Sequence, residues 1–323
     1  MDNTGRHLIL EEEMEEVKSS PFKWREGIRI TVANKRLRCN GKTITDAFAK
    51  GILKEADARI MEVLDDYGYL NRRNIERAVN MSLSEELRKP DYKRNISNLV
   101  THGVLIRYEI SFPDGSRAPH AYSLSRGATA YMRARETRSV FNHLFTASPE
   151  TITGRPKELL KTLAFNQFHL SFLSDYREHI EKYYTGYSVR TPEGRTLLNG
   201  VYRFPNSSVP SGHYDAVCVV LRFYAGWQKD YLRTLSAVKS ADIITSPVVI
   251  AVCENDMYIR DAEMCRRSSS VHRDMCVFYT VDIHCTGEPI LDYLYCVRPE
   301  NNYQTHEIVH IRLWNEEKET RQS

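Results

Sequence analysis

Hydrophobic residues between positions 53 and 124 recur first with the period of a helix and then with the period of a strand. One helical face is formed by Ala56, Ile60, Val63, Leu64 and Tyr67. Gly68 follows where a helix would end, because glycine readily accepts a positive φ. Asn71 is a typical N-cap and predicts a second helix after it. Pro90 fits the first position of a third helix, which Gly103 would end.

The third helix buries one stripe and leaves a polar face. Its apolar stripe consists of Tyr92, Ile96, Leu99 and Val100. The segments VLIRYEISF and HAYSLS then alternate as two strands around the turn Pro113-Asp114-Gly115. Three helices followed by a β-hairpin are the order of a winged helix-turn-helix, and we assign this fold to residues 51–145.

Acidic and basic residues are segregated within the first 50 positions. Residues 1–17 carry six acidic side chains against one basic, whereas residues 18–50 carry nine basic against two acidic. The acidic part either contacts the basic part, competes with DNA for it, or is solvated alone. Alternation around Asn34-Lys35 and Asn40-Gly41 favours a β-hairpin in this extension.

A second domain is predicted over residues 156–315, after a linker of Ser, Pro, Gly and Thr at about 146–156. Its pattern begins with a long apolar helix after Pro156. Strands follow at YTGYSVR, GVYRFPN and HYDAVCVV, then a helix, a strand at SPVVIAVC, another helix and the strand CVFYTVDI. This is a mixed α/β (α+β) plan with a central sheet.

Composition narrows the class of protein. The 323 residues are enough for about two domains, and a net charge of +3 excludes only a uniformly basic protein. No apolar run approaches the length of a membrane span, and the acidic start lacks the apolar region of a secretory signal. Seven cysteines without a CxxC pair indicate reduced thiols in the cytoplasm. We expect them to be small buried apolar residues, and a zinc site of His284 with these thiols is the weaker alternative.

The polar face of the third helix has the residue types that read DNA. Cations contact phosphates, and Arg or Asn bonds to base edges in the major groove. The predicted DNA-binding residues are Arg72, Arg73, Lys93, Arg94, Ser97, Asn98, Thr101, Arg107, Arg117 and His120, with Lys35, Arg36 and Arg38 in the basic extension. Arg94, Ser97 and Asn98 are the candidates for base contacts. The alternatives are a solvated face or a protein-interaction module.

Several segments together resemble the replication-relaxation family of mobile genetic elements. They are ADARIMEVLDDYGYLNRRNIERAV, ISNLVTHGVLIRYE, HAYSLSRGATAYM, PKELLKTLAFNQFHLSFL, YDAV and WQKDYLRTLSAVKSADIITSPVVIAV. The resemblance covers roughly residues 53–255. It implies a winged helix followed by a domain of restriction-endonuclease-like plan.

Enzymes of that plan hold Mg²⁺ with two acids and use a nearby Lys. Asp215 stands where the first acid would be, but the following CVVLRFYAG has no second acid and no Lys. We therefore expect Asp215 to be a degenerate remnant that bonds to a loop, and the domain to be non-catalytic, without metal or cofactor.

Three hypotheses follow. The first is a sequence-specific protein of a plasmid, phage or integrative element that binds double-stranded DNA in replication, relaxation or transcription control. Its second domain would form a homodimer or dock a protein partner. The second is an antitoxin of the type IV kind, which regulates its own operon and neutralises a toxin. The third is a metal-dependent nuclease.

Overall fold

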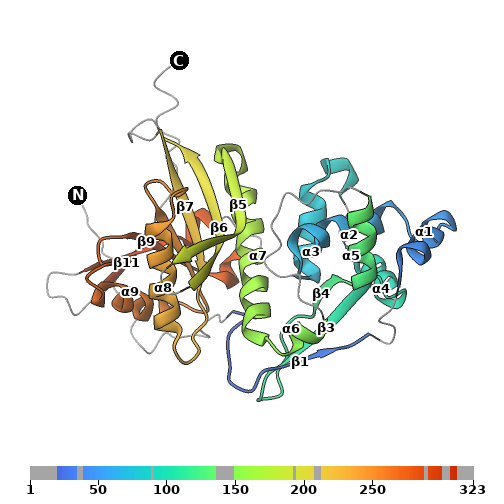
Figure 1. Cartoon of the computed structure of the whole chain (residues 1–323), viewed down its shortest axis with the longest axis horizontal. Helices are drawn as coiled ribbons and strands as arrows, with labels where there is room; N and C mark the ends of the chain where they lie inside the picture. Colours follow the sequence, from blue (N-terminus) through green and yellow to red (C-terminus); the bar gives the residue numbers. More distant parts are fainter. Residues whose placement is uncertain are drawn as a thin grey trace, which may run out of the picture.

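The computed structural model describes residues 20–34, 39–88, 91–135, 149–191, 194–206, 212–286, 290–299 and 306–310. They form two lobes on either side of one central helix, α7 (Figure 1). The described helices include none that is both long and apolar enough to cross a membrane. All seven cysteines are free thiols.

The N-terminal lobe combines helices with a four-stranded sheet of order β1-β3-β4-β2. Its elements are β1 (Arg29–Val32), α1 (Gly41–Ala49), α2 (Glu55–Tyr67), β2 (Leu70–Asn71), α3 (Arg72–Met81), the 3-10 turn η2 (Glu85–Leu87), α4 (Lys93–Thr101), β3 (Leu105–Ser111), β4 (Ala121–Leu124) and α5 (Arg126–Ala134). The predicted order of three helices and a hairpin is present as α2, α3, α4, β3 and β4.

Local signals explain the ends of these helices. The Asn71 side chain accepts a hydrogen bond from the Asn74 N–H at 2.8 Å and so begins α3. Gly68 and Gly103 end α2 and α4 with φ of 72° and 71°. The predicted start of the third helix at Pro90 is wrong, since α4 begins at Lys93, where Asp91 Oδ1 accepts the Lys93 N–H at 2.5 Å.

The β-hairpin expected within the first 50 residues is also wrong. Residues 41–49 are the helix α1, and Asn40 is its N-cap rather than a turn residue. The strand β1 pairs antiparallel with β3, with Ile30 opposite Ile110. Asn34 continues this contact, because its side-chain Nδ2 donates to the Leu105 carbonyl at 2.7 Å and its Oδ1 accepts the Arg107 N–H at 2.6 Å.

The C-terminal lobe is built around a seven-stranded sheet of order β11-β10-β9-β8-β7-β6-β5. Its elements are α6 (Pro149–Thr153), α7 (Pro156–Tyr176), η3 (Arg177–His179), β5 (Lys182–Thr191), β6 (Gly194–Pro205), β7 (His213–Val220), α8 (Trp227–Ser240), β8 (Val248–Cys253), α9 (Met257–Ser268), β9 (Cys276–Val281), η4 (Asp282–Thr286), η5 (Ile290–Tyr293), β10 (Tyr295–Pro299) and β11 (His306–His310).

The strands β7, β8 and β9 run parallel, whereas their neighbours on both sides are antiparallel. The mixed α/β plan is therefore confirmed. The predicted linker at about 146–156 is wrong in part, because α6 lies within it and contacts β1.

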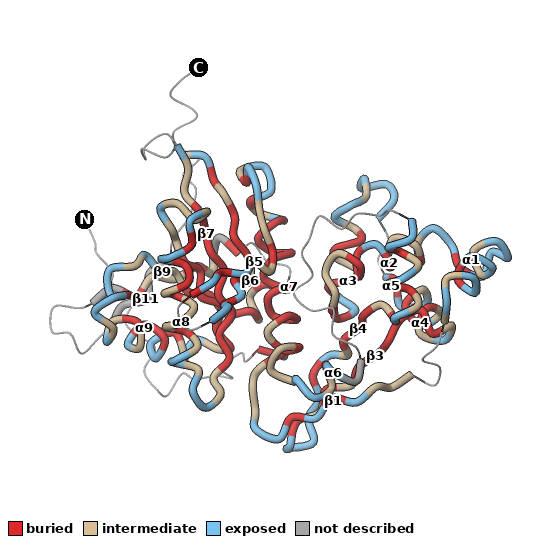
Figure 2. Tube along the Cα trace, viewed as in Figure 1, coloured by how far each residue is buried: buried red, intermediate tan, exposed pale blue. Residues whose placement is uncertain are grey.

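The central helix α7 is buried on all sides, which explains why it has no polar, solvent-facing side. Every residue from Leu159 to Leu173 is buried except Lys161 (Figure 2). Phe168 and Phe172 pack with the sheet in a core that also contains Ile30 and Ile110 of the N-terminal lobe. α8 and α9 cover the opposite face of the sheet. The two lobes therefore share one hydrophobic core across α7.

Polar contacts also join the lobes. Asn166 of α7 donates to the carbonyls of Tyr67 and Tyr69 at 3.0 and 2.7 Å. Arg77 of α3 donates to the Cys285 carbonyl of η4 at 3.1 Å. These bonds satisfy carbonyls at the end of α2 and in η4, so they fix the distance and rotation of the lobes as well as adding to stability.

A buried ion pair lies at the carboxyl ends of the parallel strands. Arg222 follows β7, Asp282 follows β9, and both side chains are fully buried with 2.5 Å between them. Ser20 also donates its hydroxyl to Asp282 at 2.7 Å, and the Trp24 N–H donates to Glu254 after β8 at 3.0 Å. We call residues 20–24 the N-terminal strap, since they close this edge of the sheet.

We predict that Asp282→Ala destabilises the protein by about 3–5 kcal/mol, because the buried Arg222 loses the carboxylate that it hydrogen-bonds and keeps only the charge of nearby Glu254. Urea unfolding measures the loss. Asp261→Ala is the matched control, since Asp261 is exposed on α9, and its effect should stay within about 0.5 kcal/mol. A loss below about 1 kcal/mol in Asp282→Ala would show that the pair does not support this edge.

Candidate nucleic-acid interface

A cavity of about 920 Å³ lies between the lobes, and most of the predicted DNA-binding residues line it. Three parts of the N-terminal lobe contribute: the first turn of α3, one side of α4, and the β3–β4 hairpin. The predicted residues in its lining are Arg72, Arg73, Lys93, Ser97, Thr101, Arg107 and His120. Residues that are up to 48 positions apart in the sequence therefore meet on one concave surface.

The helix α4 presents two different polar sides. Lys93, Ser97 and Thr101 are exposed and line the cavity. Arg94 is exposed outside the lining, and the Asn98 side chain donates to the Ile52 carbonyl at 3.1 Å. Of the three predicted base-reading residues, the structure therefore places only Ser97 in the cavity.

The remaining predicted residues lie elsewhere. Arg117 is exposed at the far end of the hairpin, where its backbone forms an isolated antiparallel β-bridge with that of Ser111. Lys35, Arg36 and Arg38 lie outside the described residues, so their predicted phosphate contacts stay predictions.

The cavity is electropositive. Arg72, Arg73, Lys93 and Arg107 contribute cations, and none of the described residues in its lining is Asp or Glu. Carboxylates border the cavity: Glu76 lies 3.6 Å from Arg72, Glu109 lies 3.9 Å from Arg107, and Asp91 Oδ1 accepts the Lys93 backbone N–H at 2.5 Å. Arg73 and Lys93 form no ion pair within the described part of the chain. Two cations therefore remain available to an anionic ligand.

His120 adds a titratable group to this surface. Partial burial lowers the pKa of His120 below its usual value, and the charges of Arg107 and Arg117 lower it further, against the opposing effect of Glu109. The imidazole is therefore neutral at pH 7 and gains its charge only in more acidic solution.

The sequence did not reveal the other wall of the cavity. Pro21 and Ala33 contribute from the N-terminal segment, Gln167 from α7, and Ile283 and Thr286 from η4. None of these residues belongs to a DNA-binding pattern. Their position depends on how the lobes pack across α7, and no local signal encodes it.

Asp215 is fully engaged in the folded chain. Its carboxylate oxygens lie 3.0 and 3.1 Å from Nε and Nη2 of Arg203, and they accept the Thr245 N–H at 2.8 Å. Thr245 belongs to the loop between α8 and β8, so the predicted loop contact is confirmed. The described residues include no cluster of three His, Cys, Asp or Glu side chains that could hold a metal ion.

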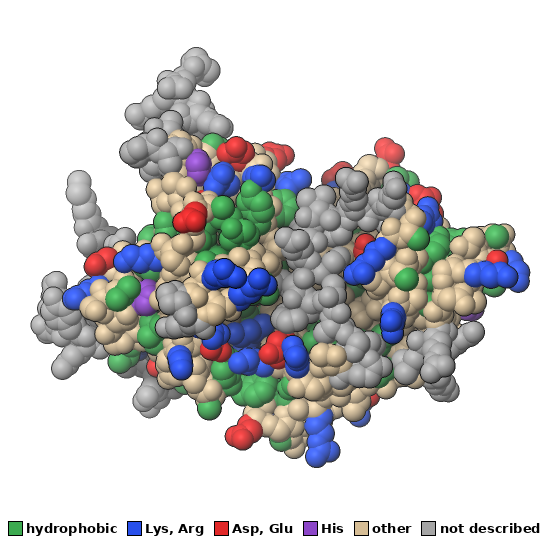
Figure 3. Space-filling view, in the orientation of Figure 1, with side chains coloured by type: hydrophobic (Ala, Val, Ile, Leu, Met, Phe, Trp, Pro, Cys, Tyr) green, Lys and Arg blue, Asp and Glu red, His purple; other side chains and the backbone are tan. Residues whose placement is uncertain are grey.

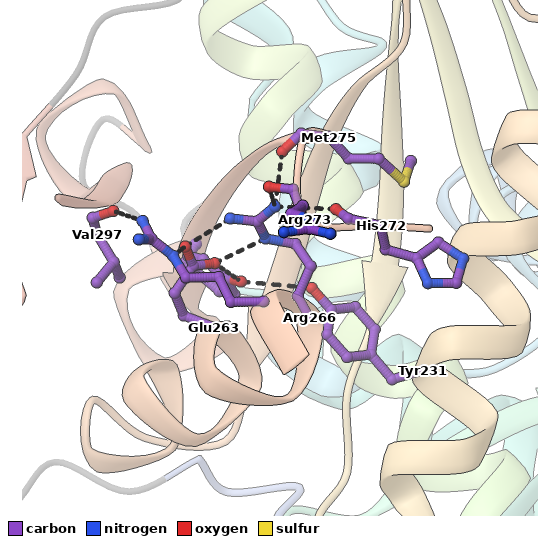
Figure 4. Close-up of polar contacts among 9 residues, drawn as sticks. Tyr231, Glu263, Arg266, His272, Arg273, Met275 and Val297 are labelled. Carbon is purple, nitrogen blue, oxygen red and sulfur yellow. Dashed lines mark hydrogen bonds and ion pairs between the residues drawn. The ribbon is translucent and has the colours of Figure 1, made fainter. Parts of the chain in front are cut away.

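A second charged cluster is structural. Glu263 of α9 receives hydrogen bonds from Arg266, Arg267 and Tyr279. Burial raises the pKa of Glu263, but these donors outweigh it and hold the pKa below its usual range. Figure 4 shows Arg266 between Glu263 and the carbonyls of His272 and Met275. The charged groups of this cluster bond to one another and to carbonyls of the same lobe, so the cluster offers no site for a ligand.

The outer surface shows no single charged field on the face in Figure 3, where Lys and Arg are interspersed with acidic side chains over both lobes. This agrees with the net charge of +3. Among the described residues, the lining of the cavity instead gathers four Arg and Lys side chains and no carboxylate.

Comparisons with protein-family models, with curated proteins and with solved structures found no match to this chain.

Proposed function

We propose that this protein binds double-stranded DNA through α3, α4 and the β3–β4 hairpin. The observation that carries the proposal is the convergence of these three elements on one surface that has four cations and no carboxylate in its described lining. Phosphate contacts supply most of the affinity of DNA-binding proteins, and such a surface suits them.

In this proposal α2, α3 and α4 with the hairpin are a winged helix, and α4 is its recognition helix. The order α7, β5, β6, β7, α8, β8 supports a restriction-endonuclease-like plan for the second lobe, with three antiparallel strands followed by a parallel one. The Asp215 carboxylate already accepts hydrogen bonds from Arg203 and from the Thr245 N–H. We therefore propose a non-catalytic role for this lobe.

The resemblance to the replication-relaxation family supports a role in replication, relaxation or transcription control of a mobile genetic element. The seven free thiols support a reducing compartment such as the cytoplasm.

The double variant Arg73→Ala, Lys93→Ala should bind duplex DNA at least tenfold more weakly in a gel-shift titration. The slope of log affinity against log salt should fall by about one for each cation that contacts a phosphate. Arg260→Ala, on exposed α9, is the matched control and should leave both quantities unchanged. An unchanged slope in the double variant would contradict the proposed interface.

Duplex binding should strengthen as the pH falls from 7 to 5, because DNA favours the protonated form of His120. His120 is neutral above its lowered pKa and adds one cation below it, so the gain appears on acidification. The gain in duplex affinity on acidification should be a few-fold smaller in His120→Gln. His213→Gln, in β7, should show the full gain. Identical pH profiles for the two variants would exclude His120 from the interface.

We also propose that the C-terminal lobe joins two copies through α9. Met257 and Met264 lie seven residues apart on one side of this helix and are 59% and 60% exposed, and Val271 beyond it is 55% exposed. Apolar side chains exposed together often mark a protein interface. Sedimentation should show a dimer that Met264→Glu shifts to monomer, with Arg94→Ala, on exposed α4 of the other lobe, as the control. A monomer at all concentrations would contradict this arrangement.

A further inference from the structure

The cavity between the lobes is too small for a duplex. A cylinder about 20 Å across with a rise of 3.4 Å encloses roughly 1,000 Å³ for each base pair. A duplex segment of several base pairs therefore exceeds the cavity, whose volume is about 920 Å³. The cavity falls within the range of pockets that bind small molecules and cofactors, roughly 300–1,000 Å³. The duplex can lie across its mouth, but only one or two nucleotides fit inside.

The walls divide into a cationic part and an apolar part. Arg72 and Arg73 occupy the first turn of α3, and Lys93 is the first residue of α4. Asn71 caps the N-terminus of α3 and the Asp91 carboxylate caps that of α4, so the positive charge at this end of the cavity comes from the side chains of Arg72, Arg73 and Lys93. Arg107 contributes a further guanidinium from β3. This combination suits a phosphate group.

The apolar part comes from both lobes. Ile96 and Val100 of α4 and Pro119 before β4 face the cavity from one lobe, and Ile283 of η4 faces it from the other. Tyr122 adds an aromatic ring, and Gln167 of α7 adds an amide whose Nε2 already donates to the Asp282 carbonyl. A flat heteroaromatic base can pack on such walls and still meet hydrogen-bonding groups.

We propose that the cavity binds a nucleotide unit, with its phosphate at Arg73 and Lys93 and its base against the apolar walls. The unit is either a free nucleoside phosphate or an unpaired nucleotide of a DNA strand. The proposal concerns the inside of the cavity, and it does not require duplex binding at the outer surface.

Calorimetric titration of the full chain tests this with deoxyadenosine 5′-monophosphate and with a strand of four deoxyadenosine nucleotides. Deoxyadenosine and inorganic phosphate are the controls for base and phosphate alone. Binding of both nucleotide probes identifies a site for free nucleotides. Binding of the strand alone identifies a site for an unpaired strand. In both cases the separate controls should bind at least tenfold more weakly.

Two variants locate the binding. Ser97→Trp fills the cavity from an exposed helical position, and Lys93→Ala removes a phosphate partner. Each should weaken nucleotide binding at least tenfold. Arg94→Ala is the matched control, because Arg94 is a cation of the same helix outside the lining. Thermal unfolding confirms that each variant is folded.

The proposal is overturned if neither nucleotide probe binds, if inorganic phosphate binds as tightly as the mononucleotide, or if folded Ser97→Trp binds normally. A gel shift with duplex DNA on the same samples separates the two proposals. Duplex binding without nucleotide binding contradicts only the cavity site. Nucleotide binding without duplex binding contradicts only the proposed DNA interface.

Discussion

Both lobes are held together by the burial of α7. Apolar side chains occur on every side of this helix, and the sheet of one lobe and the helices of the other cover them. Leu170 of α7 belongs to the core of the N-terminal lobe, whereas Phe168 and Phe172 pack toward the sheet. The lobes therefore cannot separate without exposing this helix.

The N-terminal strap adds a second constraint on the same geometry. It bonds to Asp282 and Glu254 in one lobe, and a few residues later β1 pairs with β3 in the other. Ligands of open α/β sheets commonly bind at the carboxyl ends of parallel strands. In this chain the strap and the buried pair of Arg222 with Asp282 occupy that edge. The cavity that we propose as a ligand site lies instead at the boundary between the lobes.

Local signals predicted much of the fold. The helical periodicity predicted α2 and α3, with Gly68 and Asn71 marking the boundary between them. Gly103 marked the end of α4, and the alternation of polar and apolar residues predicted the β3–β4 hairpin. The errors within the first 50 residues share one cause, which is that Asn and Gly serve several local structures. Asn40-Gly41 reads as a turn but begins α1, and Asn34 reads as a turn but bonds to β3. For the site, the sequence identified the cations of α3 and α4. It could not identify Gln167 or Ile283, whose position is set by long-range packing alone.

Amide hydrogen exchange of the full chain, with and without duplex DNA at low salt, would show which part of the surface binds DNA. We expect slower exchange in the first turns of α3 and α4 and in the β3–β4 hairpin, with α8 and α9 unchanged. Slowing confined to the C-terminal lobe, or no slowing at a DNA concentration that saturates binding, would contradict the proposed DNA interface.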